Sequence, residues 1–298
     1  MMASRPKVLL IVNPVAGKTK GRTALFPLTE GFCRAGYIPT VHVTGARGDA
    51  RHITEQLAAQ HDLVVCCGGD GTLNEVIDGL LACEKQIPLG YIPAGSTNDF
   101  ANSLHLKTQP VAALRDILGG SNDAMDIGLF NGVRHFSYIA SFGIFTAASY
   151  NAPQTTKNAL GHFAYLLEGS KELFSVQSHQ IVAQTADKRY EGDYLFGAVC
   201  NSTSVAGLVK LNAGMVDMSD GLFEVILVRR PMNPAEIARV LNSINTADFD
   251  PELFDFFKAS EVTFTMKEPL PWSLDGEYAE GAATITVKNV PQAILLRH

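Results

Sequence analysis

The feature that most constrains the fold of this chain is a change in the spacing of apolar residues near residue 128. Before that point, short apolar runs alternate with longer stretches that have helical periodicity. Strands that are apolar throughout and separated by helices are typical of a parallel sheet covered on both faces. Residues 1–128 therefore predict a three-layer α/β domain. We expect its strands at residues 7–12, 40–44, 63–67 and 89–92, and its helices at residues 18–35, 49–60, 72–82, 98–104 and 111–118.

From residue 129 onward, apolar and polar residues alternate mostly with a period of two. The dipeptides Asn131-Gly132, Asp220-Gly221 and Asp275-Gly276 separate some of these runs, and such pairs favour tight turns. Many short strands at this spacing predict an antiparallel β-sandwich, so a second, all-β domain is expected at residues 129–298. We expect strands at residues 135–140, 180–184, 194–200, 223–228, 262–266, 283–287 and 293–296, and helices at about residues 161–174 and 234–244.

Composition excludes several classes of protein. The formal net charge is −6 and the pI is about 5.7, whereas a chain whose main partner is nucleic acid concentrates lysine and arginine. No run approaches the ~18 apolar residues of a membrane-spanning helix, and we interpret the apolar start as a first strand instead of a signal peptide. The five cysteines include no C-x-x-C pair, which favours buried thiols in a reducing cytoplasm.

The strongest functional signal is the run Gly68-Gly69-Asp70-Gly71-Thr72, which follows a predicted strand and precedes a predicted helix. Glycine lets the backbone approach a polyphosphate without a clash from Cβ, and the helix N-terminus offers N–H groups and the positive end of its dipole. In an open parallel sheet, ligands bind at the carboxyl ends of the strands, where this run falls. The run matches neither G-x-x-x-x-G-K-[ST] nor G-x-G-x-x-G, so it predicts a phosphate site of another kind.

Two further loops are expected at the same edge of the sheet. The sequence NPVAGK at residues 13–18 follows the first strand, and PAGSTND at residues 93–99 follows the fourth. Thr44 ends the second strand in the same layer. Asp70 and Asp99 would then lie close together, and two carboxylates beside a triphosphate are best explained as holding Mg²⁺. The alternative for either residue is capping of a helix N-terminus.

Five segments together resemble the catalytic family of diacylglycerol kinases, and most closely its soluble bacterial lipid kinases. The order of the segments matches the family and spans nearly the whole chain. GGDGT alone also occurs in NAD kinases and phosphofructokinases, but the following Leu73-Asn74-Glu75 resembles the lipid-kinase pattern. The segments are NPVAGK at 13–18, GGDGTLNEV at 68–76, GSTNDFA at 95–101, DGLFEV at 220–225 and LDGEY at 274–278.

The resemblance implies a nucleotide-binding α/β domain followed by a β-sandwich, with the active site in the cleft between them. It implies that Asp70 and Asp99 belong to a network of aspartate, water and Mg²⁺. It also implies a metal-binding turn with Asp220 as side-chain ligand and Asp217 and Leu222 contributing. By this resemblance the ATP-contacting residues are Asn13, Pro14, Val15, Ala16, Gly17, Thr44, Gly68, Gly69, Asp70, Gly71, Thr72, Leu73, Asn74 and Ser96.

The segment Asp275-Gly276-Glu277 contains the remaining candidate catalytic residues. Asp-Gly indicates first of all a tight turn, although in an extended strand two carboxylates two residues apart would face the same side. Phosphoryl transfer needs a group that accepts the proton of the substrate hydroxyl, and a carboxylate suits that task. The resembling enzymes use this motif for the general base. The sequence does not divide the role between Asp275 and Glu277, so both are predicted catalytic residues.

The residues and the resemblance lead to one hypothesis, an ATP- and Mg²⁺-dependent lipid kinase that converts diacylglycerol to phosphatidic acid in phospholipid biosynthesis. The sequence leaves open another lipid alcohol as acceptor, such as a monoacylglycerol or a sphingoid base. It also leaves open an NAD kinase, and a nucleotide-binding regulatory protein without catalysis. The expected partners are ATP and a membrane lipid, reached by transient contact of a cytoplasmic protein with the inner face of the membrane, and no nucleic acid. The chain could also form a homodimer, because the sequence does not fix the oligomeric state.

Overall fold

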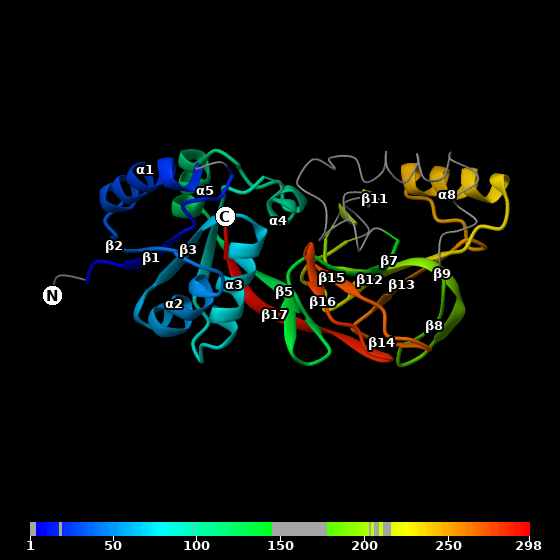
Figure 1. Ribbon diagram of the computed structural model, residues 1–298. Helices are drawn as coiled ribbons and strands as arrows, with labels where there is room; N and C mark the ends of the chain where they lie inside the picture. The colour runs from blue at the N-terminus through cyan, green and yellow to red at the C-terminus, as the bar shows by residue number, and fades with distance from the viewer. Residues whose placement is uncertain are drawn as a thin grey trace. The chain divides into compact units, whose positions relative to one another are not determined.

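The chain divides into two compact units. The first consists of the chain up to Asp126 together with Gln292–His298, and the second is Ile127–Pro291. Figure 1 shows the computed structural model as a ribbon. The residues that it describes are 4–17, 20–96, 98–144, 178–202, 204–205, 209–210 and 216–298.

A parallel sheet forms the centre of the first unit. It contains β1 (Lys7–Val12), β2 (Ile38–Val43), β3 (Leu63–Gly68), β4 (Pro88–Pro93) and part of β17 (Thr284–Arg297). The strands follow the order β2-β1-β3-β4-β17, and each neighbouring pair is parallel. β3 is buried along its whole length, as expected for a strand covered on both faces.

Helices cover both faces of this sheet (Figure 1). They are α1 (Lys20–Arg34), α2 (Asp49–Leu57), α3 (Asp70–Leu81), α4 (Asp99–Ser103) and α5 (Pro110–Gly119), with a short 3₁₀ turn η1 (Ala58–Gln60) after α2. α1 and α5 contribute Phe32 and Leu114 to a core that also contains Leu10 of β1. The neighbouring residues Leu9 and Ile11 point the other way and are equally buried, on the face where α3 contacts α2 and β3.

The second unit is built mainly from antiparallel strands. β9 is central, because it pairs with β7, β8 and β12. β5 and β17 contribute residues to both units. The strands are β5 (Asn122–Phe130), β6 (Arg134–Phe136), β7 (Ile139–Gly143), β8 (His179–Gln184), β9 (Arg189–Cys200), β10 (Ser204–Val205), β11 (Val209–Lys210), β12 (Phe223–Arg229), β13 (Phe254–Ala259), β14 (Glu261–Met266), β15 (Trp272–Leu274) and β16 (Glu277–Ala279).

An aromatic cluster lies at the core of the second unit. The ring of Trp272 lies 4.7 Å from that of Phe142, 5.2 Å from that of Phe130 and 5.3 Å from that of Phe264, measured between centroids. A helix, α8 (Pro234–Thr246), is capped by Asn233, whose side chain accepts a hydrogen bond from the Glu236 N–H. The predicted fold class, an α/β unit followed by an antiparallel β unit, is confirmed.

Several elements differ from the sequence-based prediction. The strand expected at 135–140 is divided into β6 and β7, because the N–H groups of Ser137 and Tyr138 bond a carboxylate instead of a neighbouring strand. The strands expected at 283–287 and 293–296 form the single strand β17. β5, β13, β15 and β16 were not predicted, and the helix expected at 161–174 lies outside the described residues. None of the described helices has both the length and the apolar character needed to cross a membrane.

The end of β17 should stabilise the first unit. Leu296 is fully buried and pairs with Leu89 of β4. We expect Leu296→Ala to lower the free energy of unfolding by about 2–5 kcal/mol, through lost burial and the cavity left behind. Urea unfolding of the full chain measures this. Val111→Ala, at a side chain that is 44% exposed, is the control and should change stability by less than about 0.5 kcal/mol. Equal effects of the two substitutions would contradict the prediction.

Candidate functional site

Three loops at the carboxyl ends of the parallel strands lie against one another in the first unit. The Asn13 N–H donates to the Cys67 carbonyl at 2.9 Å, and the Asn13 Nδ2 donates to the Thr72 Oγ1 at 2.9 Å. The Ala94 N–H donates to the Gly68 carbonyl at 2.8 Å. The structure therefore brings together the loops after β1, β3 and β4, which are the three loops predicted to bind phosphate.

Two glycines in these loops are required by close contact between backbones. Gly17 has a φ of +52°, and a Cβ on it would lie 2.0 Å from the Ala94 carbonyl oxygen. A Cβ on Gly95 would lie 2.6 Å from the Gly69 Cα. These glycines permit the loops to approach one another. Gly71 is different, because it is exposed in the first turn of α3.

The N-terminus of α3 lies at the centre of these loops. The helix begins at Asp70 and not at residue 72 as predicted, so Asp70 and Gly71 belong to its first turn. Its N-cap, Gly69, has no side chain that could cover the first-turn N–H groups. The helix is 12 residues long, and its dipole places partial positive charge at this end. Leu73 is fully buried, so its side chain contributes to the core and only its backbone is near the loop.

Asp70 caps a second helix. Its carboxylate accepts hydrogen bonds from the N–H groups of Asp99, at 3.1 Å, and Phe100, at 3.3 Å, at the start of α4. Asp70 therefore caps a helix N-terminus, which was the alternative to a metal-binding role, and this contact is compatible with a ligand at the same carboxylate. Asp99 follows directly in the same contact, through its N–H, and the charges of Asp70 and Asp99 both act on Tyr91. The two carboxylates fit Mg²⁺, which commonly uses one or two carboxylates, substrate phosphates and water.

The other residues predicted to contact ATP lie around this centre. Val15 is 77% exposed, and its N–H donates to the Asn13 Oδ1 at 3.1 Å. The Thr44 N–H donates to the Val12 carbonyl at 2.9 Å, which fixes the loop after β2. Ser96 is exposed in the loop after β4. Pro14, Ala16 and Asn74 are partly buried beside these loops.

Three residues that shape these loops were not among the predicted site residues, although two of them fall within the quoted motifs. The buried Tyr91 hydroxyl donates to the Gly68 carbonyl at 3.3 Å, and burial followed by the nearby charge of Asp70 raises the pKa of Tyr91 well above its usual value. The Asn98 Nδ2 donates to the Gly95 carbonyl at 3.0 Å. Glu75 accepts from the N–H groups at residues 48 and 50, where α2 begins. The polar tyrosine within the apolar run LGYIP was the available signal for Tyr91.

The turn at residues 217–222 in the second unit is organised by its own carboxylates. The Asp217 Oδ1 accepts from the Ser219 Oγ at 2.7 Å and from the Ser219 N–H at 3.0 Å, and these bonds lower the pKa of Asp217. The Asp220 Oδ1 accepts from the Leu222 N–H at 2.9 Å. Asp217 and Asp220 are exposed, and Leu222 is partly buried.

A lysine forms an ion pair with one carboxylate of this turn. The Lys258 Nζ lies 3.3 Å from the Asp220 Oδ2 and 2.9 Å from the Glu224 Oε1. Glu224 is fully buried, and this burial raises the pKa of its carboxyl group. No group of three or more His, Cys, Asp or Glu side chains that could hold a metal ion occurs within the described part of the chain. With an ammonium group on Asp220, the arrangement does not fit a divalent cation on that side chain.

The segment Asp275-Gly276 forms the turn between β15 and β16. Leu274 pairs with Glu277, and the two residues between them have φ values of +50° and +83°. Two central residues with positive φ are typical of a two-residue hairpin. The prediction of a tight turn is confirmed. Because Asp275 is in the turn and not in an extended strand, the alternation that would place both carboxylates on one face does not apply.

Asp275 is a buried acceptor of hydrogen bonds. Its Oδ2 accepts from the Ser137 N–H at 2.6 Å and from the Ser137 Oγ at 3.0 Å. Its Oδ1 accepts from the N–H groups of Ile139 at 2.9 Å and Tyr138 at 3.0 Å. The side chain thus ties the turn to the segment between β6 and β7, and the residue is only 7% exposed.

Glu277 lies in a different environment. Its side chain is 38% exposed, and its Oε2 accepts from the Arg134 Nη2 at 2.8 Å. The Arg134 Nη1 donates to the Tyr278 carbonyl at 2.7 Å. The structure therefore separates two carboxylates that the sequence left equivalent, since one is enclosed by main-chain donors and the other is accessible and held by a side chain.

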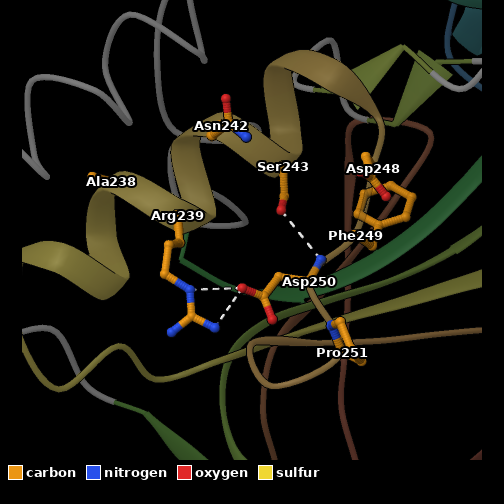
Figure 2. A pocket seen from close by; sticks show the side chains of 8 residues that line it. All are labelled: Ala238, Arg239, Asn242, Ser243, Asp248, Phe249, Asp250 and Pro251. Carbon is orange, nitrogen blue, oxygen red and sulfur yellow. Dashed lines mark hydrogen bonds and ion pairs between the residues drawn. The ribbon is translucent and has the colours of Figure 1, made fainter.

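A surface hollow in the second unit contains none of the predicted site residues. It lies beside α8, and Figure 2 shows Asp250 bonded to Arg239 and to Ser243. Arg239 bonds Asp250 at 2.7 Å and Glu252 at 2.5 Å, and the Ser243 Oγ accepts from the Asp250 N–H at 3.2 Å. These bonds fasten α8 to the loop that follows it, which gives the polar groups of the hollow a structural role.

Comparison with known proteins gives consistent matches over nearly the whole chain. Residues 7–130 match the diacylglycerol kinase catalytic domain, and residues 139–298 match the YegS C-terminal NAD kinase beta sandwich-like domain. The chain is 32% identical over 272 residues to a diacylglycerol kinase of Bacillus subtilis (strain 168), covering 90% of this chain and 89% of that protein. It is 31% identical over 278 residues to a diacylglycerol kinase of Staphylococcus carnosus (strain TM300), covering 92% and 89%.

A solved structure supports the fold. A crystal structure of a diacylglycerol kinase from Bacillus anthracis str. Sterne superposes with a TM-score of 0.77, covering 99% of this chain and 98% of that one. The two sequences are 21% identical, and at this level the likeness concerns the fold alone.

Substitution of Asp275 should destabilise the protein. We expect Asp275→Ala to lower the free energy of unfolding by about 3 kcal/mol or more, because buried main-chain donors at residues 137–139 lose a charged acceptor. Chemical unfolding of the full chain measures this. Glu280→Ala, at an exposed acidic residue that follows β16, is the control and should have a small effect. A stable Asp275→Ala variant would contradict the structural role given to this carboxylate.

Proposed function

The chain belongs to the diacylglycerol kinase family, and on this premise we propose that it transfers the γ-phosphoryl group of ATP to the free hydroxyl of diacylglycerol, giving phosphatidic acid and ADP. The observation that carries the proposal is the uncovered N-terminus of α3 among three packed loops. Such a helix end binds phosphate through its N–H groups and its dipole. Relatives named diacylglycerol kinase, at 31–32% identity over most of the chain, support the choice of acceptor.

The nucleotide phosphates are proposed to lie at the first turn of α3. Gly71 is exposed there, so phosphate oxygens can approach its backbone closely. Asn13 and Thr72 are bonded to each other at the edge of the same loops. We propose that the other predicted residues also contact ATP, and that Leu73 does so through its backbone. These residues are Asn13 to Gly17, Thr44, Gly68 to Asn74 and Ser96.

Asp70 and Asp99 are the residues proposed to hold Mg²⁺ with the nucleotide. When bound, this ion neutralises charge on the transferring phosphates. Asp70 would at the same time keep the start of α4 in place, because its carboxylate bonds the N–H groups of Asp99 and Phe100. The turn at Asp217, Asp220 and Leu222 has no metal ion in the proposed reaction, because the Lys258 Nζ lies 3.3 Å from the Asp220 Oδ2.

Glu277 is proposed as the general base. It accepts the proton of the diacylglycerol hydroxyl while that oxygen forms a bond to the γ-phosphorus and the bond to the ADP oxygen breaks. Asp275 is proposed to position the hairpin, since its oxygens accept hydrogen bonds from Ser137, Tyr138 and Ile139. Diacylglycerol lies in a bilayer, so the reaction brings the chain into transient contact with a membrane surface, for which we propose the cytoplasmic face.

A panel of acceptors tests the proposed function. The full chain is incubated with labelled ATP and Mg²⁺, and with diacylglycerol, a monoacylglycerol, a sphingoid base or NAD as acceptor. We expect label in phosphatidic acid. Transfer to another acceptor in preference to diacylglycerol would contradict the proposed substrate. ATP binding by calorimetry without transfer to any acceptor would indicate a regulatory protein and overturn the proposal.

Glu277→Gln should remove the base and preserve the shape of the side chain. We expect kcat for diacylglycerol to fall by about 10²- to 10⁴-fold, the usual contribution of a general base. The melting temperature should stay close to that of the wild type. Glu280→Gln, at the nearby exposed carboxylate, should leave kcat unchanged and serves as the control. Wild-type turnover by Glu277→Gln would exclude Glu277 as the base.

Gly71→Ala should separate nucleotide binding from stability. Alanine in the first turn of α3 should leave stability unchanged or raise it by up to about 1 kcal/mol, because glycine is the poorer helix former. The added Cβ would intrude on the proposed phosphate position, so we expect the KM for ATP to rise at least about tenfold, or about 1.4 kcal/mol of binding. Steady-state kinetics and thermal unfolding measure both. An unchanged KM would contradict a phosphate at this turn.

A further inference from the structure

One short segment of the second unit holds both acidic residues of the β15–β16 hairpin. Arg134, at the start of β6, bonds Glu277, and residues 137–139, which follow β6, bond Asp275. We propose that Arg134 is a positioning residue for the reaction, because it fixes the carboxylate of Glu277 in the orientation that accepts the proton of the lipid hydroxyl. This inference rests on the proposed function and assigns a residue that the family motifs do not contain.

The contact geometry supports this role. The Arg134 Nη2 donates to the Glu277 Oε2 at 2.8 Å, and the Arg134 Nη1 donates to the Tyr278 carbonyl at 2.7 Å. The planar guanidinium group presents its donors in a rigid fork. It therefore binds the side chain of Glu277 and the backbone of the next residue at once, which fixes the carboxylate relative to its own strand, β16.

The position of Arg134 is itself fixed by the core. Arg134 pairs across the β5–β6 hairpin with Phe130, and Phe136 on the same strand pairs with Gly128. Phe130 is 3% exposed and Phe136 is 1% exposed. The buried rings hold β6 at both ends, so the guanidinium group projects from a rigid strand. Groups held in this way on regular elements keep reacting atoms in place more precisely than groups on free loops.

Stability alone gives little reason for this ion pair. The side chains of Arg134 and Glu277 are 33% and 38% exposed, and exposed ion pairs contribute about 0–1 kcal/mol. The second unit contains another pair of arginine and carboxylate for comparison. The Arg229 Nη2 donates to the Asp255 Oδ2 at 2.7 Å, and the side chains of Arg229 and Asp255 are 32% and 14% exposed. Arg229 also donates through its Nη1 to a main-chain carbonyl, that of Glu191 at 3.4 Å.

Kinetics of three variants of the full chain test the inference. Arg134→Met removes the guanidinium group, Arg134→Lys keeps the charge without the fork, and Arg229→Met is the control. For Arg134→Met we expect kcat with diacylglycerol to fall by about 10- to 100-fold, since small misplacement of a reacting group costs up to that much. The KM values for ATP and diacylglycerol should stay within about twofold, because binding is not lost. Arg134→Lys should recover part of kcat, and Arg229→Met should leave it unchanged.

A double-mutant cycle distinguishes positioning from direct action. In Glu277→Asp the side chain is one methylene shorter, so its carboxylate no longer reaches Arg134 in the same way. If Arg134 acts through Glu277, adding Arg134→Met to Glu277→Asp should lower kcat by less than about threefold, because interacting residues are not additive. The melting temperature should fall no more in Arg134→Met than in Arg229→Met, because the partner Asp255 is more buried and Arg229 also lies over the ring of Tyr194. A purely structural role would then not produce the difference in kcat.

The outcomes are distinct. Unchanged kcat in Arg134→Met, with an active wild type, would overturn the inference alone. A raised KM for ATP with unchanged kcat would make Arg134 a phosphate-binding residue and overturn it as well. Equal losses of kcat in the wild-type and Glu277→Asp backgrounds would show that Arg134 does not act through Glu277. A wild type without transfer to any acceptor would overturn the proposed function and this inference together.

Discussion

Carboxylate groups that accept main-chain N–H groups hold the loops of both units, and the remaining geometry depends on them. Asp70 bonds the start of α4, and Glu75 bonds the start of α2. Asp126, which is buried, accepts from the Gln292 N–H at 2.8 Å, where β17 enters the first unit. Asp275 does the same for the segment between β6 and β7. Hydrogen bonds to a charged group contribute about 1.5–3 kcal/mol, more than neutral ones, so a few side chains can fix many loop atoms.

Most regular elements could be predicted because their signals are local. The apolar runs at β1, β3 and β4 and the helical periodicity between them depend only on neighbouring residues. β15 and β16 could not be predicted in the same way, because each has only three residues and their pairing depends on the turn at Asp275. β13 lacks strict alternation, and it pairs as an edge partner of β12 across a long separation in sequence. Non-local pairing of this kind leaves no local pattern.

The sequence identified acidic residues of the site but could not assign their tasks. Asp70 caps a helix that begins 29 residues later in the chain, a contact that no spacing rule predicts. Asp275 and Glu277 look equivalent in the sequence, and their difference comes from partners more than 130 residues away, Ser137 and Arg134. The glycine pattern indicated close approach correctly, but at Gly17 and Gly95 the approaching group is a second loop of the same chain.

The way each carboxylate is held limits what it can do in turnover. Protonation of Asp275 would weaken its bonds to the buried N–H groups of residues 137–139, so proton uptake there would cost stability in every cycle. The Glu277 carboxylate contacts the side chain of Arg134, which is itself partly exposed, so its role as a base does not depend on the main-chain bonds that hold the hairpin. A base must gain and lose a proton without disturbing the structure that aims it. In this hairpin the Asp275 carboxylate maintains the structure through the N–H groups that it accepts. The Glu277 carboxylate contacts a side chain, which leaves it able to react.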